Sequence, residues 1–187
     1  MATRARLLDA TIASLVRVGY AGTSTNEVCR RARVARGTQL HHFPSKHALV
    51  AAAIEHLFAR RLEEFRERVA AIAPGRTRID AAIAVMLEIY TGPTLAAWLE
   101  LVVAARTDAA LRACVAEVEQ RFFALATASF RELLGPGLTP ARARATTRIV
   151  LAAFDGLALH HMVQRDRTTL EGAAAVLRML LHEEATT

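Results

Sequence analysis

The amino-acid sequence predicts an all-α protein, and three observations support this. Apolar residues recur every three or four positions along most of the chain, which places them on one face of a helix. No segment shows the alternation of apolar and polar residues that is typical of a half-buried strand. Glycine, proline and short polar clusters separate the periodic segments, so each segment is predicted to be one helix. Since 53% of the 187 residues are hydrophobic, these helices can bury a sizeable core.

The first helix is predicted over residues 3–18. Leu8, Ile12 and Leu15 recur at helical spacing and form its apolar stripe. Gly19 follows directly, and glycine is the residue most often found just past the end of a helix.

Two short helices are predicted next, between Thr23 and Lys46. Ser24 and Glu27 have the spacing of a capping box, in which the hydroxyl and the carboxylate each accept a backbone N–H bond at the start of a helix. Residues 33–35 interrupt this helix, and a second one is predicted over residues 36–43, closed by Pro44. Two short helices with a tight break, rich in Arg, Asn, Gln, His and Thr, are typical of a helix-turn-helix DNA reader.

The net charge is concentrated in the same part of the chain. Residues 1–50 contain eight Lys and Arg residues against two carboxylates, which accounts for the whole net charge of +6. A basic segment on an otherwise neutral chain favours a polyanionic partner, because phosphate contacts release counterions. The alternative is a solvated basic face without a partner.

The run from Leu7 to Leu49 resembles the N-terminal domain of TetR-type transcriptional repressors. The residues that match the family pattern are Gly19, Tyr20, Thr23, Ser24, Thr25, Val28, Cys29, Ala32, Val34, Gly37, Thr38, His42, Phe43 and Lys46. The rest of the chain matches the family in length and helical pattern.

The sequence departs from the family pattern at four positions in this region. Arg33 stands where the family usually has Gly, and a left-handed Arg33 would cost on the order of 1 kcal/mol. Ala35 replaces a common capping Ser, at a cost of roughly 1 kcal/mol. Gln39 and Leu40 replace an apolar residue and a Tyr that usually reaches a phosphate.

Six further helices are predicted after the reader. A long helix from Ser45 to about Ala73, ended by Pro74 and Gly75, would link the reader to the rest of the chain. The others are predicted at about 77–90, 94–106, 109–134, 140–164 and 169–183. We therefore predict a three-helix DNA-binding domain over residues 1–48. A six-helix effector-binding and dimerisation domain is predicted over residues 49–187.

Residues of the second short helix are the main candidates for DNA contact. Arg can bond guanine O6 and N7 with two hydrogen bonds, and Thr can bond a base or contact a thymine methyl group. Gln39 can read adenine if it points outward, but the resemblance places it inward. The resemblance implies that Thr25 and Lys46 contact phosphates. Asn26 is expected to reach a base edge. Arg4 is expected to reach a phosphate or a minor groove. The predicted DNA-binding residues are Arg36, Gly37, Thr38, His41, His42, Lys46, Thr25, Asn26, Gln39 and Arg4.

The resemblance also implies an effector pocket and a dimer interface in the second domain. The apolar helix faces there are first explained as core, and an effector pocket is the second explanation. Glu100 stands in an apolar run, so it is expected to face solvent, to pair with Arg106 or to meet a cationic ligand. The predicted pocket residues are Trp98, Tyr90, Met86, Phe122, Glu100, Phe58 and Phe65. The predicted contacts of an isologous dimer through the last two helices are Val150, Phe154, Leu157, His161, Leu170, Leu177, Leu180 and Leu181.

The sequence predicts a homodimeric, ligand-responsive transcriptional regulator, most often a repressor, that binds a palindromic operator. The alternative is an all-helical ligand- or partner-binding module with an impaired DNA reader. No enzyme motif, cofactor site or metal-ligand spacing is recognised. No apolar run of membrane-spanning length and no secretion signal is found, so a cytoplasmic protein without a membrane partner is expected.

Overall fold

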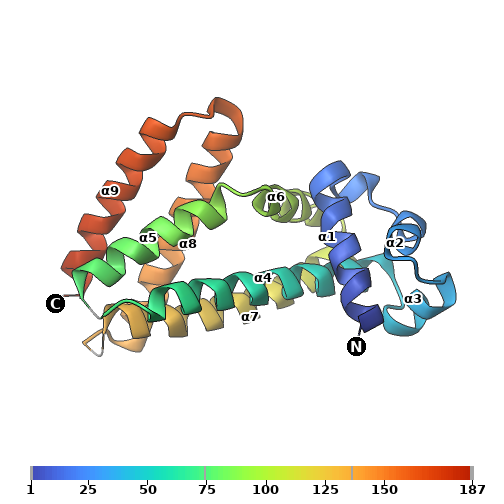
Figure 1. The fold of residues 1–187 in the computed structure, drawn as a ribbon, viewed down its shortest axis with the longest axis horizontal. Coiled ribbons are helices and arrows are strands. Elements are labelled where there is room, and N and C mark those ends of the chain that lie inside the picture. The colour runs from blue at the N-terminus through green and yellow to red at the C-terminus, as the bar shows by residue number, and fades with distance from the viewer. Residues whose placement is uncertain (1, 74, 136, 186–187) are drawn as a thin grey trace. The chain divides into compact units, whose positions relative to one another are not determined.

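The computed structural model describes residues 2–73, 75–135 and 137–185, and these residues form nine α-helices without a strand (Figure 1). The prediction of an all-α fold is therefore confirmed. The helices are α1 (Ala2–Gly22), α2 (Thr25–Ala32), α3 (Arg36–His42), α4 (Lys46–Ala70), α5 (Arg76–Tyr90), α6 (Pro93–Ala105), α7 (Ala109–Leu134), α8 (Pro140–Gln164) and α9 (Arg167–Glu184).

Most helix bounds agree with the predicted ones within three residues. The exception is α1, which was predicted to end at residue 18 but continues past a non-helical Gly19 to Gly22. The bounds of α7 and α8 are those predicted. Helix α9 begins two residues early because Oδ1 of Asp166 accepts the N–H groups of Thr168 and Thr169 at 2.9 and 3.3 Å. Helix α4 ends at Ala70 rather than Ala73. Pro74, predicted to end α4, and Pro136, predicted to lie in a break, are outside the described residues.

The chain divides into two compact units. The first comprises Met1–Arg60 with Pro93–Phe122, and the second comprises Arg61–Gly92 with Phe123–Thr187. Helices α4 and α7 each contribute residues to both units. The first unit therefore contains the helix-turn-helix segment together with α6, whereas the sequence predicted a functional division at residue 48.

The first unit has two apolar clusters. One holds α1, α2 and α3 on the beginning of α4, and its buried residues are Leu7, Leu8, Ala10, Val28, Ala32, Phe43, Leu49 and Ala53. The other joins α1 and α4 to α6 and α7 through Leu15, Val50, Ile54, Leu57, Ala97, Leu101, Ala105, Leu111 and Val118. Replacing one such buried leucine by alanine costs about 2–5 kcal/mol. These clusters hold α2 and α3 in place on α1 and α4, and α1 also packs along α6.

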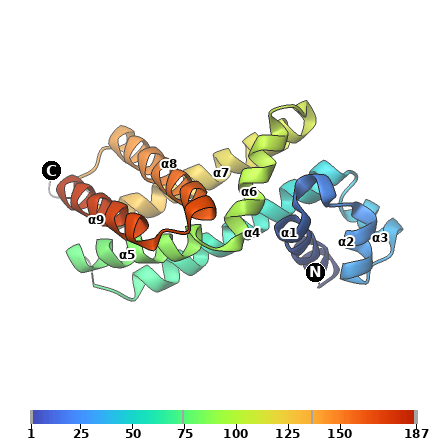
Figure 2. The same ribbon diagram turned by 90° about the horizontal axis from the view of Figure 1, so that it is seen from above.

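In the second unit, α5 packs against both α8 and α9, which also contact each other (Figure 2). Their shared core includes Ile79, Ile83, Phe154, Ala174 and Leu181, all almost fully buried. Within the described residues, no single helix combines the length and the apolar composition needed to cross a membrane, although α5 and α6 taken together as a broken pair do.

Candidate DNA-binding site and candidate ligand site

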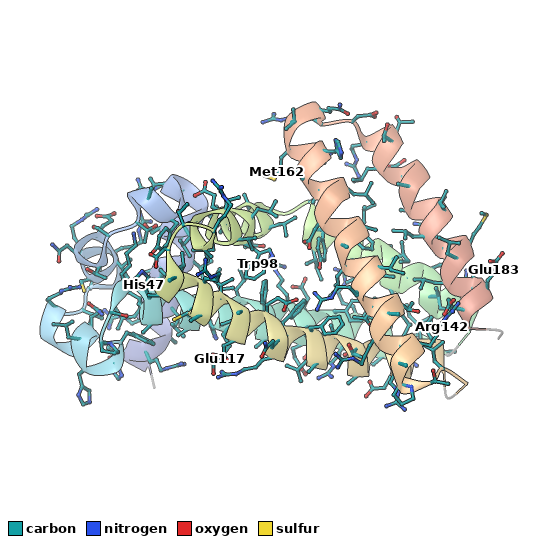
Figure 3. All side chains as sticks on the ribbon, turned by 180° about the vertical axis from the view of Figure 1, so that it is seen from behind. His47, Trp98, Glu117, Arg142, Met162 and Glu183 are labelled. Carbon is teal, nitrogen blue, oxygen red and sulfur yellow. The ribbon has the colours of Figure 1, made fainter. Side chains whose placement is uncertain are left out.

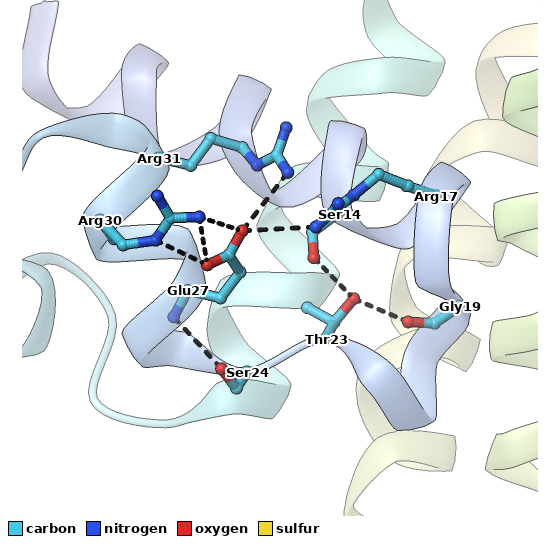
Figure 4. A network of polar contacts seen from close by, with 8 residues as sticks. All are labelled: Ser14, Arg17, Gly19, Thr23, Ser24, Glu27, Arg30 and Arg31. Atoms are coloured by element: carbon cyan, nitrogen blue, oxygen red, sulfur yellow. Dashed lines mark hydrogen bonds and ion pairs between the residues drawn. The ribbon is translucent and has the colours of Figure 1, made fainter.

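Helix α2 begins with the cap that the sequence predicted. Ser24 has extended backbone geometry, and its Oγ accepts the N–H of Glu27 at 3.2 Å. The return bond of the capping box is replaced by ion pairs, because the Glu27 carboxylate binds Arg30, Arg31 and Arg17 at 2.9, 3.4 and 3.4 Å (Figure 4). Hydrogen bonding from Arg30 holds the pKa of Glu27 below its ordinary value.

The turn between α2 and α3 is made by a left-handed arginine. Arg33 has φ 52° and ψ 49°, the geometry in which a glycine is usually found. Its N–H donates to the carbonyl of Arg30 at 3.2 Å. Nη2 of Arg6 donates to the carbonyl oxygens of Arg33, at 2.8 Å, and of Ala32. These bonds satisfy the carbonyls left without a partner at the end of α2.

The three N-terminal helices α1, α2 and α3 form the head of the protein. Gln39 lies inside this head and is not available for base contact. Its side chain is fully buried: Nε2 donates to the carbonyl of Phe43 at 2.7 Å, and Oε1 accepts from Arg36. The inward position implied by the family resemblance is therefore the observed one, and the assignment of Gln39 to DNA contact is corrected. The bond to Phe43 closes the end of α3.

The outer face of α3 is polar and accessible. Arg36, Gly37, Thr38, His41 and His42 are all exposed. Gly37 and His41 are about half a helical turn from the buried Gln39, so they occupy the side of α3 that faces away from the core. A side chain at Gly37 would meet no atom within 4 Å, so the surface is open there. This face is the part of the head that can enter a DNA groove.

The remaining predicted DNA contacts differ in how freely their side chains project. Asn26 is exposed and Thr25 is half-buried, both in the first turn of α2, where backbone N–H groups favour an anion. The guanidinium of Arg4 lies over the Phe43 ring, 5.6 Å from its centre. Nζ of Lys46 donates to the carbonyl of Tyr20 at 2.8 Å and lies 4.1 Å from the centre of its ring. Burial lowers the pKa of Lys46.

The sequence interpretation did not assign a role to the cluster of arginines around Glu27. Arg30 is largely exposed, and the cluster combines one carboxylate with three guanidinium groups. The spacing of Glu27, Arg30 and Arg31 is the i, i+3, i+4 pattern that indicates ion pairs within a helix, so these pairs could have been predicted from the sequence. Arg17, on α1, has no such local signal.

Glu100 is exposed, as the first of the three sequence-based expectations held, and it also has a backbone partner that none of them named. Its Oε2 accepts the backbone N–H of Tyr20 at 2.9 Å, so the carboxylate on α6 binds the end of α1. A second polar contact lies near it, where Nε2 of His47 meets Oδ2 of Asp108 at 2.9 Å. The other oxygen of Asp108 accepts the N–H of Leu111 at 2.9 Å, which holds the pKa of Asp108 below its ordinary value, with His47 adding to the effect.

The residues predicted to line an effector pocket fall into two groups. Phe58, Trp98 and Phe122 gather in the first unit, where the ring of Phe58 lies 4.9 Å from that of Trp98 and 4.6 Å from that of Phe122. All three are half-buried. Trp98 is labelled in Figure 3. In the second unit, Phe65 and Met86 are buried in the core. There the ring of Tyr90 lies 5.2 Å from that of Phe154, and burial raises the pKa of Tyr90.

The predicted dimer contacts need revision. Five of them are buried inside the protomer: Val150, Phe154, Leu170, Leu177 and Leu181. Leu157 and His161 are half-buried, and Leu180 is exposed. The apolar side chains that α8 and α9 expose are instead Ile149, Leu159, Met162, Val163, Val176, Met179 and Leu180.

A compact helix-turn-helix head with an exposed polar second helix, on an all-helical chain, defines the class of helix-turn-helix transcriptional regulators. Comparison with known families agrees. Residues 7–53 match the family described as bacterial regulatory proteins, tetR family, and residues 74–186 match the C-terminal domain of BetI-type transcriptional repressors. The chain belongs to the TetR family, and it is a transcriptional regulator with an N-terminal DNA-binding domain.

Individual relatives support the same assignment over most of the chain. An uncharacterized HTH-type transcriptional regulator of Mycobacterium tuberculosis is 34% identical over 161 residues, which cover 84% of this chain and 81% of that protein. The HTH-type transcriptional regulator CymR of Pseudomonas putida is 31% identical over 172 residues, covering 91% and 85%. The crystal structure of a TetR-family regulator from Rhodococcus sp. has the same fold, with a TM-score of 0.77 at 21% identity over 96% of each chain.

Proposed function

We propose that this protein is a homodimeric repressor that binds a palindromic DNA operator and releases it when a small molecule binds. The observation that carries the proposal is the outer face of α3, where Arg36, Thr38 and His41 are exposed on a helix fixed from behind by Gln39 and Phe43. Such a helix can enter the major groove and read base edges. The surplus of positive charge within residues 1–50 supplies the attraction to phosphates.

A dimer is supported by the apolar surface of α8 and α9. Ile149, Gly156 and Val163 recur every seven residues along α8, so they share one face. A side chain at Gly156 or at Gly172 of α9 would meet no atom within 4 Å, so the fold of one protomer does not require glycine at either place. A face of small and exposed apolar residues suits close packing against a second copy. Two heads related by a two-fold axis would then read half-sites about 34 Å apart.

A small-molecule effector is supported by the cluster of Phe58, Trp98 and Phe122. Partly exposed aromatic rings in contact with one another are typical of a surface that binds an apolar, aromatic or cationic ligand. Binding would alter repression only if the ligand has different affinities for the DNA-bound and the DNA-free conformations. Since the proposed partner is chromosomal DNA, we place the protein in the cytoplasm.

Selection of bound sequences from random duplex DNA tests the proposal. We expect a palindrome whose two halves are one helical turn apart, and recovery of no preferred sequence would refute it. Thr38→Ala and His41→Ala should each weaken binding to the selected operator roughly 5- to 100-fold, the cost of losing a base contact of about 1–3 kcal/mol. Glu132→Ala, which changes an exposed residue of α7 outside both the head and the exposed apolar face of α8 and α9, is the control and should leave binding unchanged.

An impaired reader is the alternative function, and two departures favour it. Ala35 provides no side-chain cap for α3, and Leu40 is 46% exposed where the family often has a Tyr. Against this, Arg6 bonds the left-handed turn and Gln39 closes α3, which supports a rigid reading helix. The same selection separates the two functions, because an impaired reader would enrich no sequence at low salt.

A further inference from the structure

Helix α1 is broken at Gly19, three residues before its end at Gly22. Gly19 has φ 66° and ψ −175°, which is outside helical geometry and in the region that L side chains rarely adopt. The carbonyl of Gly19 accepts the hydroxyl of Thr23 at 2.7 Å and its N–H at 3.2 Å. The break turns the chain toward the reader and leaves the N–H of Tyr20 outside the regular helix.

A carboxylate from α6 accepts that N–H. Oε2 of Glu100 lies 2.9 Å from the nitrogen of Tyr20, although the two residues are 80 positions apart. The approach depends on glycine, because a β-carbon at Gly19 would lie 1.8 Å from Oε2 of Glu100. The left-handed backbone requires glycine at this position, and a β-carbon there would also force the carboxylate of Glu100 to move away.

The other side of the Tyr20 residue is bound from α4. Nζ of Lys46 donates to the Tyr20 carbonyl at 2.8 Å and lies over its ring. Lys46 is three residues beyond Phe43, which ends the reading helix, and it is the only lysine in the sequence. Next to it, His47 bonds Asp108 at 2.9 Å. The end of α1 and the start of α4, which flank the helix-turn-helix, are thus bound to each other and to two carboxylates from α6 and the α6–α7 connection.

We propose that Glu100 is a positioning residue for DNA binding: by accepting the Tyr20 N–H, its carboxylate fixes the reading head on α6 and so sets the affinity for the operator. This inference rests on the proposed function and deepens it. A displacement of α6 withdraws the acceptor from Tyr20, and the bonds of Tyr20 and Lys46 carry that change to both ends of the helix-turn-helix. The head and α6 belong to one compact unit, which is the arrangement this role requires.

Hydrogen exchange in the full-length protein tests the contact itself. Glu100→Ala removes the acceptor, so the Tyr20 amide should exchange at least 10-fold faster than in the wild type. Glu100→Gln keeps an oxygen that can accept the bond, so it should restore most of the protection. Glu132→Ala, a change of an exposed glutamate on α7, is the control and should leave Tyr20 exchange unchanged. Equal exchange in the wild type and Glu100→Ala would overturn the proposal.

Operator binding tests the positioning role. Glu100→Ala should weaken binding to the full palindrome about 5- to 20-fold but change binding to a single half-site less than two-fold. The reason is that the base-reading side chains are intact and only the placement of the two heads is altered. Equal weakening on both DNAs, or unchanged binding to the palindrome, would overturn the inference. Failure of the wild type to bind any operator would instead refute the proposed function.

A second variant keeps the test independent of how well Glu100→Ala folds. Gly19→Ala evicts the carboxylate and strains the backbone, whereas Gly19→Ala in a Glu100→Ala background only strains the backbone. Gly19→Ala should therefore weaken palindrome binding several-fold more in the wild type than in the Glu100→Ala protein. Additive effects would show that Gly19 and Glu100 act separately and would overturn the proposal.

Discussion

The guanidinium of Arg6 donates a hydrogen bond of 2.8 Å to the carbonyl of Arg33, the left-handed residue that ends α2. Arg6 also donates to the carbonyl of Ala32, so one side chain of α1 satisfies two carbonyls of the helix-turn-helix turn. The bonds do not remove the backbone strain at Arg33, because a β-carbon in left-handed geometry still crowds its own carbonyl. They fix the turn in the geometry that a glycine would adopt more readily.

Arg33→Gly should therefore stabilise the protein. Relief of left-handed strain contributes roughly 1–2 kcal/mol, and the larger freedom of glycine in the unfolded chain offsets about half of it. We expect a gain of roughly 0.5–1 kcal/mol in the free energy of unfolding, measured by denaturant titration.

The control for this prediction is Arg30→Gly. Arg30 lies within α2 and is largely exposed, so the same chemical change there should destabilise by about 1 kcal/mol. A loss of stability in Arg33→Gly, similar to that in Arg30→Gly, would show that the Arg33 side chain makes a compensating contribution.

The helix bounds could be predicted from the sequence where local chemistry determines them. Helix α8 begins at Pro140 because Thr139 caps it, and α7 begins after Asp108, whose carboxylate accepts the N–H of Leu111. Both signals lie within a few residues of the helix start. The Ser24 cap and the break at Gly19 were predictable for the same reason.

The parts of the site that the sequence did not predict depend on contacts between distant residues. Nothing local to Glu100 indicates that Tyr20, 80 positions earlier, donates to it. On α8, Ile149 and Val150 are neighbours and both apolar, yet one is 64% exposed and the other 2%. Helical periodicity identifies apolar faces, but it does not say which face meets the protomer's own core. The predicted dimer contacts were therefore placed mostly on the inner face.

Whether Lys46 contacts a DNA phosphate can be tested directly. The family resemblance places it on a phosphate, whereas its Nζ bonds the Tyr20 carbonyl at 2.8 Å and lies over the Tyr20 ring. We expect Lys46→Met to change the slope of log affinity against log salt by less than about 0.3, although a direct phosphate contact would change it by about 0.9. If the slope in operator titrations falls by nearly one unit, Lys46 does contact a phosphate in the DNA complex.

The ion pair between Arg142 and Glu184 should make stability depend on pH. Oε2 of Glu184 accepts from Nε of Arg142 at 2.9 Å and from Thr146 at 3.2 Å, and the bond from Arg142 lowers the pKa of Glu184. A carboxyl group whose pKa is lowered by folding stabilises the folded state above its unfolded pKa, and this contribution is lost as the pH falls toward the folded pKa. Stability from this pair should therefore be complete at pH 7 and decline below about pH 4.5.

Unfolding of Glu184→Gln at several pH values measures that contribution. The variant should be less stable than the wild type at pH 7, and the difference should shrink steadily between pH 5 and pH 3. Glu132→Gln on α7 provides the comparison at an exposed glutamate. A difference that stays constant over this pH range would mean that the loss at pH 7 reflects packing rather than charge.

The exposed apolar face of α8 and α9 is where we expect the two protomers to meet. Val163 is 81% exposed and Met179 is 61% exposed, so neither side chain contributes to the protomer's own core. A glutamate at either position would be buried without a partner in the proposed dimer. Burial of this unpaired carboxylate costs about 3 kcal/mol, so dimerisation should weaken on the order of 100-fold. Val163→Glu and Met179→Glu should therefore sediment as monomers at micromolar concentration with unchanged helical content.

The control for this prediction is Val103→Glu, which changes a 66% exposed valine on α6 and should remain dimeric. If the α8 and α9 variants stay dimeric while Val103→Glu dissociates, the interface lies on α6 instead.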